Sequence, residues 1–303
     1  MKVLVYGSLN IDLIFSVDHI VRPGETISSS ALEKGAGGKG ANQAAALAKA
    51  GMTVYMAGKI GSDGEFLLDL LQSYGVNTDH VARYEGATGQ ALIQLDKDHQ
   101  NSIVLFAGGN GVIQPEEIDS VLGCFGEGDI IVLQNEITQI SEIMKQAKKR
   151  GLKICLNPSP FDEKIEARPL DLVDIFFVNE IEGAALAALE VPSVPLAPFA
   201  LSLYLSEIFD RLIDRFPNAE IILTKGKDGA FYAGGKKRAR GEIIDTPVVD
   251  TTGAGDTFTG YFIAARSKDF SIEESLDIAC KAASIAVSRK GAMQSIPFKE
   301  EVF

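Results

Sequence analysis

The amino-acid sequence predicts an α/β fold in which helices flank a mostly parallel sheet and a second, smaller sheet lies over this body. The first observation behind this prediction is a series of short apolar runs separated by helical patterns, among them residues 141–150 and 198–216. Such alternation is typical of βαβ units, whose parallel strands are buried on both faces. The expected strands of the body are 3–6, 129–133, 153–157, 175–178 and 221–224.

A different pattern predicts the smaller sheet. Four segments alternate imperfectly between polar and apolar side chains: residues 12–19, 26–34, 89–95 and 102–106. Strands of this kind usually pair antiparallel and keep one face in water. They come in two pairs, separated by a helix-and-strand stretch at about 40–75. We therefore expect two excursions of the chain that combine into one small sheet.

The composition restricts the possible partners. The chain has 303 residues, is 46% hydrophobic and carries a formal charge of −12. This charge argues against nucleic acid or an anionic membrane as a partner, because both require a basic surface. The three cysteines form no CxxC pair, which argues against disulfides and structural zinc. No apolar run is long enough to cross a bilayer and no signal peptide is evident, so we expect a soluble cytoplasmic protein.

The stretch at 250–258, Asp-Thr-Thr-Gly-Ala-Gly-Asp-Thr-Phe, runs directly into an expected helix at 257–265. A helix start offers free N–H groups and a positive dipole end, and glycines let an anion approach them closely. A carboxylate at Asp256 is suited to accept a proton while charge builds on a transferred phosphoryl group. The alternative is an ordinary helix start with Asp256 favoured by the dipole, and these residues alone favour neither interpretation.

Residues 35–40 fit the pattern GxGxxG, but the preceding segment is typical of an edge strand rather than of a dinucleotide-binding unit. The segment is not a Walker A loop either, because Lys39 is followed by glycine. Lys39 lies in the first turn of an expected helix at 41–50, where a cation opposes the dipole, so a ligand-binding role is favoured. Asn42, in the same turn, is either a capping residue or a ligand contact.

Asp12 is a carboxylate within an apolar run. It is either an edge-strand residue that favours solubility or an acceptor for two neighbouring sugar hydroxyls. Asn10 is on the same face of the strand and could contribute to the second role.

Together these motifs resemble those of the ribokinase (PfkB) family of sugar kinases, in order and spacing, over about residues 2–297. The matching segments are Asn10 and Asp12, 37–43, Asn157-Pro158, 179–182, 224–226, 250–258, and 289–292 with Ser295. The resemblance implies one ribokinase-like domain over 1–303, with a doubly wound α/β body. It also implies a β-sheet lid with strands roughly within 11–36 and 88–107.

The resemblance implies a role for each matching residue. Asp256 would be the general base, and Gly253, Ala254 and Gly255 would bind the transferred phosphoryl group. The positions that match sugar contacts are Asn10, Asp12, Gly38, Lys39, Asn42, Glu136 and Asp256. Those that match the ATP site are Asn179, Thr224, Gly226, Gly229, Gly255 and Cys280, where the family often has a histidine in place of Cys280. Glu182 would help to hold Mg²⁺, and the positions that match a monovalent-cation loop, usually for K⁺, are Asp250, Thr252, Ala286, Arg289, Gly291 and Ser295.

The resemblance implies an ATP-dependent sugar kinase that converts D-ribose to ribose 5-phosphate, and a homodimer formed through the lid. The alternatives are another sugar, such as 2-deoxyribose or fructose, or a nucleoside such as adenosine or pseudouridine. A dehydrogenase that uses NAD would depend on residues 35–40 alone. A catalytically silent sugar sensor is disfavoured by the presence of Asp256.

Overall fold

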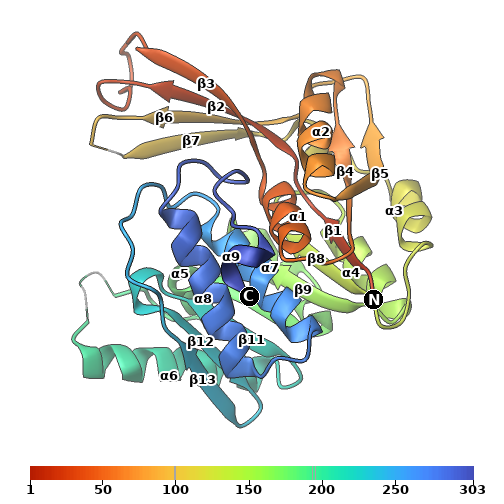
Figure 1. Ribbon diagram of the computed structural model, residues 1–303, viewed down its shortest axis with the longest axis vertical. Helices are drawn as coiled ribbons and strands as arrows, with labels where there is room; N and C mark the ends of the chain where they lie inside the picture. Colours follow the sequence, from red (N-terminus) through yellow and green to blue (C-terminus); the bar gives the residue numbers. More distant parts are fainter. Residues whose placement is uncertain (99, 193, 195) are drawn as a thin grey trace.

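The computed structural model describes residues 1–98, 100–192, 194 and 196–303. Within this part of the chain, the main sheet has nine strands in the order β13-β12-β11-β10-β9-β8-β1-β4-β5 (Figure 1). All neighbouring strands from β11 to β5 pair in parallel, and β12 and β13 add an antiparallel hairpin at one edge. The strands are β1 (Val3–Tyr6), β4 (Val54–Ile60), β5 (Asn77–Arg83), β8 (Ile130–Gln134), β9 (Lys153–Asn157), β10 (Ile175–Asn179), β11 (Glu220–Thr224), β12 (Ala230–Gly234) and β13 (Lys237–Gly241).

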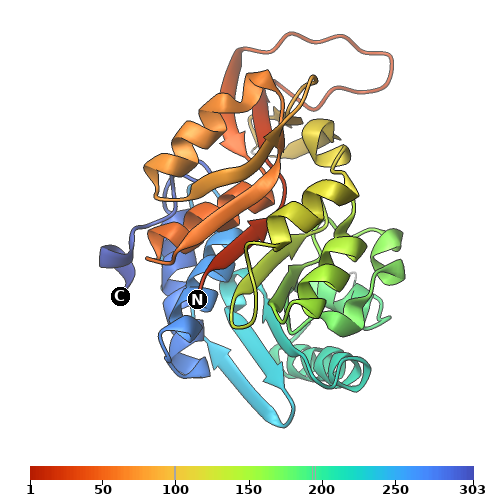
Figure 2. The ribbon, with the colours of Figure 1, turned by 90° about the vertical axis from the view of Figure 1, so that its right-hand side faces the viewer.

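Helices cover both faces of this sheet (Figure 2). Alternate residues of each buried strand point to opposite faces, so Val3 and Val5 of β1 belong to one core while Leu4 and Tyr6 belong to the other. The first core is closed by α1 (Lys39–Lys49), α2 (Glu65–Ser73), α7 (Ala254–Ser267), α8 (Ile272–Val287) and α9 (Lys299–Val302). The second is closed by α3 (Pro115–Leu122), α4 (Ile140–Lys149), α5 (Glu180–Leu186) and α6 (Pro198–Arg215). This is the doubly wound arrangement expected from the sequence.

A separate sheet of four strands projects from the body (Figure 1). Its strands, in spatial order, are β3 (Ala31–Gly37), β2 (Asn10–Ser16), β6 (Gly89–Leu95) and β7 (Asn101–Phe106). Each sequence-adjacent pair is antiparallel, as expected, but the two pairs join through parallel pairing of β2 with β6. This parallel pairing was not predicted, because the alternation of side chains is the same for both directions of pairing.

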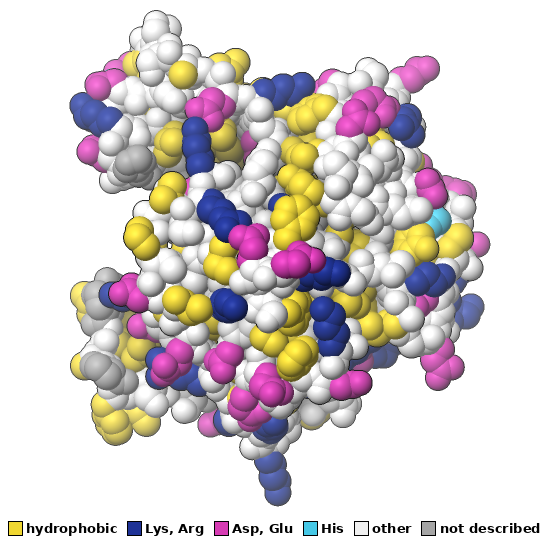
Figure 3. Space-filling view, viewed as in Figure 1, with side chains coloured by type: hydrophobic (Ala, Val, Ile, Leu, Met, Phe, Trp, Pro, Cys, Tyr) yellow, Lys and Arg dark blue, Asp and Glu magenta, His cyan; other side chains and the backbone are white. Residues whose placement is uncertain are grey.

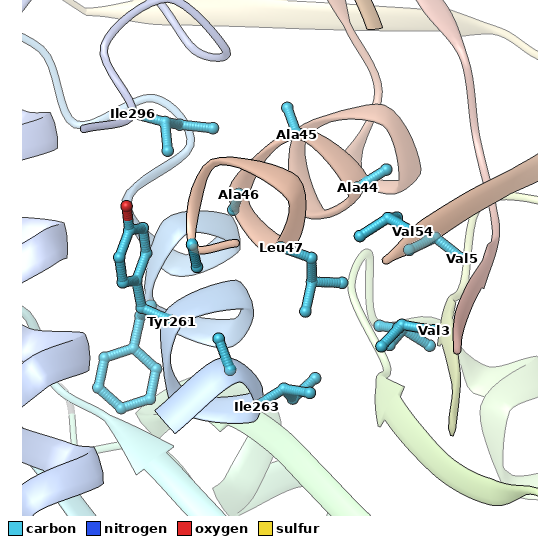
Figure 4. Packing of buried hydrophobic residues seen from close by; sticks show 14 of the residues in the cluster. Val3, Val5, Ala44, Ala45, Ala46, Leu47, Val54, Tyr261, Ile263 and Ile296 are labelled. Carbon is cyan, nitrogen blue, oxygen red and sulfur yellow. The ribbon is translucent and has the colours of Figure 1, made fainter. Parts of the chain in front are cut away.

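Helices α1 and α7 pack closely against each other on the first face of the main sheet. Figure 4 shows Ala46 and Leu47 of α1 beside Tyr261 and Ile263 of α7. The approach is close because α7 has a glycine at the contact: a Cβ at Gly260 would lie only 2.5 Å from the Cβ of Ala46. The contact between the two helices therefore depends on the absence of a side chain at Gly260.

The surface has no large region of one charge on the face that Figure 3 shows, where acidic and basic side chains are interspersed. No helix in the described residues combines the length and the apolarity that crossing a membrane requires.

We expect Gly260→Ala to lower the free energy of unfolding by about 1–3 kcal/mol, because the added methyl group would push α1 and α7 apart. Chemical denaturation would measure this loss. Gly126→Ala is the matched control, since a Cβ there would meet no atom within 4 Å. Equal stability of the two variants would show that the contact of α1 with α7 is not tightly packed.

Candidate active site

A cleft of about 210 Å³ lies beyond the carboxyl ends of the main-sheet strands. This is the edge where ligands bind in open α/β sheets. Three strand ends contribute to it: the segment after β9, the end of β10 and the end of β11. Three helices start there, α1, α5 and α7. The lining residues are Lys39, Asn157, Ser159, Phe177, Val178, Asn179, Glu182, Thr224, Thr251, Gly253, Ala254, Gly255, Asp256 and Thr259.

The start of α7 supplies a site for an anion. Gly253 precedes the helix with φ 75°, a conformation that glycine adopts without strain. The N–H of Thr257 donates to the carbonyl of Gly253 at 2.8 Å and closes the first turn. A Cβ at Gly255 would meet no atom within 4 Å, so the backbone there is open to a ligand. The remaining N–H groups of this turn and the helix dipole favour a negatively charged group.

Asp256 is held at this helix start by two amides of α1. Asn42 Nδ2 donates to Asp256 Oδ2 at 2.9 Å, and Gln43 Nε2 donates to Asp256 Oδ1, also at 2.9 Å. Asp256 is only 6% exposed, yet it lines the cleft. The carboxylate is therefore fixed in orientation and still accessible to a bound molecule. The Oδ1 of Asn42 is buried and has no hydrogen-bond partner among the described residues.

Glu136, just beyond β8, reaches the start of α1. Its Oε2 accepts hydrogen bonds from the hydroxyl of Ser8 and from the N–H of Lys39, the latter at 3.1 Å. Gly38 precedes Lys39 with φ 95°, and a Cβ there would lie 2.7 Å from the carbonyl oxygen of Ser8. Glycine at this position therefore lets the end of β3 pass directly over the end of β1.

The first residues of β2 face the same region. A Cβ at Gly37 would lie 2.1 Å from the carboxylate of Asp12, so Asp12 lies over the glycine segment before α1. Asn10 is 6% exposed, and its Oδ1 accepts a hydrogen bond of 2.8 Å from Asn110 Nδ2. The amide nitrogen of Asn10 is thereby left to donate elsewhere.

Burial of these groups changes their ionisation. Burial, with a smaller contribution from the charge of Glu136, raises the pKa of Asp12 to about 6. Burial also raises the pKa of Glu136, against the opposing effect of the Lys39 ammonium. Burial alone would lower the pKa of Lys39, but the charges of Asp256, Glu136 and Glu182 outweigh it and raise that pKa. Lys39 is therefore a cation surrounded by carboxylates at the centre of the site.

The residues expected to bind the nucleotide or Mg²⁺ are spread over the start of α5, the end of β11 and the loop after it. Asn179 caps α5 by accepting from the N–H groups of Ile181 and Glu182, and Glu182 Oε2 accepts from the N–H of Asn179 at 3.0 Å. Asn179, Glu182 and Thr224 line the cleft. Gly226 and Gly229 follow β11 in a short loop.

Cys280 differs from the other expected nucleotide residues. It lies on α8, is only 2% exposed and is not among the residues that line the cleft. Burial raises the pKa of its thiol to about 12. The thiol is therefore neutral and packed in the protein interior.

The residues expected to hold a monovalent cation lie on two adjacent loops. Asp250 joins these loops, since its carboxylate accepts from the N–H of Thr252 and from the N–H of Gly291, both at 2.9 Å. Burial opposes its charge, but these hydrogen bonds outweigh the burial and lower the pKa of Asp250. Arg289 and Ser295 lie on the second loop, Ala286 lies in the last turn of α8, and the N–H of Arg289 donates to the carbonyl of Ala286.

The structure thus brings most of the sequence-predicted residues to one region, with Cys280 buried in α8 and the cation loops beside the start of α7. Sequence reasoning did not single out Asn110, which is 3% exposed and orients Asn10. The signal that could have identified it is a lone amide between glycines directly after an expected strand. Gln43 belongs to the recognised glycine segment, but its contact with Asp256 needed three-dimensional information.

Comparison with known proteins agrees with this arrangement. A ribokinase from Haemophilus influenzae is 33% identical over 98% of this chain and 95% of its own length. A deoxyribokinase from Salmonella typhi is 30% identical over 99% of this chain and 97% of its own length. The structure of Arabidopsis thaliana ribokinase complexed with ribose and ATP superposes with a TM-score of 0.85, at 32% identity over 99% of this chain and 97% of that one.

The family described as pfkB family carbohydrate kinase matches residues 1–299. That match spans the body, the projecting sheet and the residues that line the cleft. The chain therefore belongs to the pfkB family of carbohydrate kinases and is a ribokinase-like sugar kinase.

Proposed function

We propose that this kinase transfers the γ-phosphoryl group of ATP to the primary hydroxyl of D-ribose and releases ribose 5-phosphate and ADP. The observation that carries this proposal is the position of Asp256 between an anion site and a polar cluster. On one side lies the open first turn of α7. On the other lie Lys39 and Asn42, close to Glu136. A phosphoryl donor and a polyol acceptor bound in these two places would meet at the Asp256 carboxylate.

Asp256 acts as the general base. It takes the proton of the sugar hydroxyl as the sugar oxygen forms its bond to the γ-phosphorus, and the bond from that phosphorus to the β,γ-bridging oxygen breaks. The backbone of Gly253, Ala254 and Gly255 stabilises the negative charge on the transferred group. Preorganised donors of this kind are typically worth about 3–4 kcal/mol each. Phosphoryl transfer depends mainly on positioning and electrostatics.

The sugar is held by groups of complementary hydrogen-bonding capacity. Asp12 and Glu136 accept from hydroxyls, whereas Lys39 and the amide nitrogen of Asn10 donate to them. Asn42 offers an accepting oxygen that has no other partner in the described residues. The deoxyribokinase and nucleoside kinases among the similar proteins make 2-deoxyribose and nucleosides the competing substrates.

ATP lies with its phosphates between the start of α7 and Asn179 in this proposal, and Thr224, Gly226, Gly229 and the region of Cys280 form the remainder of its site. Mg²⁺ would be held by Glu182, directly or through water, beside the phosphates. The fit is reasonable, because Glu182 lines the cleft and burial raises its pKa, a cost that a bound cation would offset. When bound, Mg²⁺ neutralises phosphate charge.

K⁺ would be held by the two loops that Asp250 joins. The described residues contain no cluster of three or more His, Cys, Asp or Glu side chains suited to a metal. A monovalent cation here would accordingly be held by backbone carbonyls around Thr252, Ala286, Arg289, Gly291 and Ser295. Because the second loop contacts the loop before α7 through Asp250, such a cation would stabilise the anion site indirectly.

A homodimer through the projecting sheet is also part of this proposal. That sheet exposes apolar side chains, which two copies could bury together. They are Leu32, Leu92, Ile103, Val104, Leu105 and Phe106. Strand β7 is an edge strand and remains available for pairing.

We expect Asp256→Asn to reduce kcat by roughly 10²-fold to 10⁴-fold, because the amide cannot accept the hydroxyl proton. Calorimetry should show that the variant still binds ribose, since the other sugar contacts remain. A coupled assay of ADP release measures the turnover. Turnover close to that of the wild type would exclude Asp256 as the base.

The KM for ribose should rise as the pH falls through about 6, the raised pKa of Asp12. Below that pH Asp12 gains a proton and loses acceptor capacity towards the sugar hydroxyls, whereas above it the carboxylate is ionised and binds. Steady-state kinetics across this range would measure the effect. Asp12→Asn should bind ribose weakly without this inflection, and an unchanged inflection in that variant would assign it to another group.

A substrate panel separates the candidate functions. In the presence of ATP and Mg²⁺, ADP release should be fastest with ribose and stimulated by K⁺, compared with 2-deoxyribose, fructose, adenosine and pseudouridine. Asp250→Ala should abolish the K⁺ stimulation, because it separates the two loops. A clear preference for 2-deoxyribose or a nucleoside would contradict the ribose assignment and leave the assignment of the family intact.

A further inference from the structure

Two glutamines lie behind the Asp256 carboxylate. Gln134, the last residue of β8, donates from Nε2 to Oε1 of Gln43 at 2.7 Å. Gln43 in turn donates from Nε2 to Asp256 Oδ1 at 2.9 Å. Both glutamine side chains are fully buried. A continuous chain of hydrogen bonds therefore runs from the central sheet, through α1, to the carboxylate on α7.

Burying the amides of this hydrogen-bonded chain costs free energy. Buried amides must be hydrogen-bonded to offset the loss of water, and Oε1 of Gln134 has no partner in the described part of the chain. Glycine at position 7 leaves the space that the Gln134 side chain occupies, because a Cβ at Gly7 would lie 2.0 Å from that same oxygen. Apolar residues at 43 and 134 would satisfy the packing without these costs. A role beyond packing would explain why the amides are present.

The geometry separates Gln43 from its neighbour on α1. Asn42 has a buried oxygen without a partner in the described residues, whereas Gln43 has both ends of its amide engaged by protein groups. Neither residue is among the described residues that line the cleft. The effect of Gln43 on the reaction must therefore pass through Asp256.

The direction of each hydrogen bond is determined by the chemistry of the chain. A carboxylate only accepts, so Gln43 must present its nitrogen to Asp256 and its oxygen to the sheet. Gln134 then meets that oxygen with its own nitrogen. A rotation of the Gln43 amide by half a turn would place its oxygen against the Asp256 carboxylate and its nitrogen against the nitrogen of Gln134, so both hydrogen bonds would be lost. Gln134 thus holds Gln43 in the one orientation that supports Asp256.

We propose that Gln43 is a positioning residue for the catalytic base and that Gln134 acts through Gln43 to hold the Asp256 carboxylate in its reactive orientation. This inference rests on the proposed role of Asp256 as the base. Together with Asn42, Gln43 leaves the carboxylate little freedom to rotate.

Gln43→Met tests the proposal, because methionine has a similar shape and donates no hydrogen bond. We expect kcat for the sugar to fall by roughly 10-fold to 100-fold through misplacement of the base, while KM changes by less than about threefold. A merely structural role would lower the melting temperature without this selective loss of kcat.

Gln134→Met should have a smaller effect of the same kind. The double variant with Gln43→Met should be no slower than Gln43→Met alone, because Gln134 has no other route to the carboxylate. If the two substitutions reduced kcat additively, Gln134 would not act through Gln43. Gln146→Met is the matched control, since Gln146 donates to Glu142 on α4, away from the cleft, and should show wild-type kinetics.

Different results would overturn the proposed kinase function and the positioning role of Gln43. An inactive wild type, or an Asp256→Asn variant with normal turnover, would overturn the proposed function itself. An active wild type with an inactive Asp256→Asn variant, combined with an unchanged kcat in Gln43→Met, would overturn only the positioning role. Circular dichroism and thermal melting of each variant establish that the comparison is made on folded protein.

Discussion

The close contact of α1 with α7 is the constraint on which the rest of the site depends. Asp256 belongs to α7, but both amides that hold its carboxylate belong to α1. Glycine at position 260 lets the two helices approach each other closely, because a Cβ there would lie 2.5 Å from the Cβ of Ala46. The same helix, α1, starts with Lys39, whose N–H contacts Glu136. One packing interface therefore sets the distance between the Asp256 carboxylate at the start of α7 and the Lys39 and Glu136 cluster at the start of α1.

The electrostatics follow from the same arrangement. The chain carries a formal charge of −12, yet it belongs to a family whose phosphoryl donors are strongly anionic. The positive potential that an anionic ligand needs comes from a few groups in the cleft. The start of α7 offers backbone N–H groups, and Lys39 is kept charged by the surrounding carboxylates. Because these groups are fixed before any ligand arrives, attraction is concentrated in the cleft and does not require a basic surface.

The sequence predicted the architecture well, since the apolar runs and glycine turns each reflect a local physical requirement. Val3–Tyr6, Lys153–Asn157 and Gly89–Leu95 form strands where the side-chain pattern indicated them. The parallel pairing of β2 with β6 and the edge hairpin of β12 with β13 were not predicted, because partner choice depends on tertiary packing. The amide contacts of Asp256 join positions more than 200 residues apart. No local pattern carries that information.

The route of β2 has a further consequence. This strand leaves the body directly after Leu9 and carries Asn10 and Asp12 into the projecting sheet, while Lys39 and Glu136 remain on the body. A sugar bound by all four residues would contact both the projecting sheet and the body. Its affinity would then depend on the free energy needed to hold the two sheets in the position that allows all four contacts. Coupling of this kind is reciprocal. A partner that restrains the outer face of the projecting sheet would therefore change the affinity of the protein for the sugar. The sugar would change the affinity of the protein for that partner by the same factor.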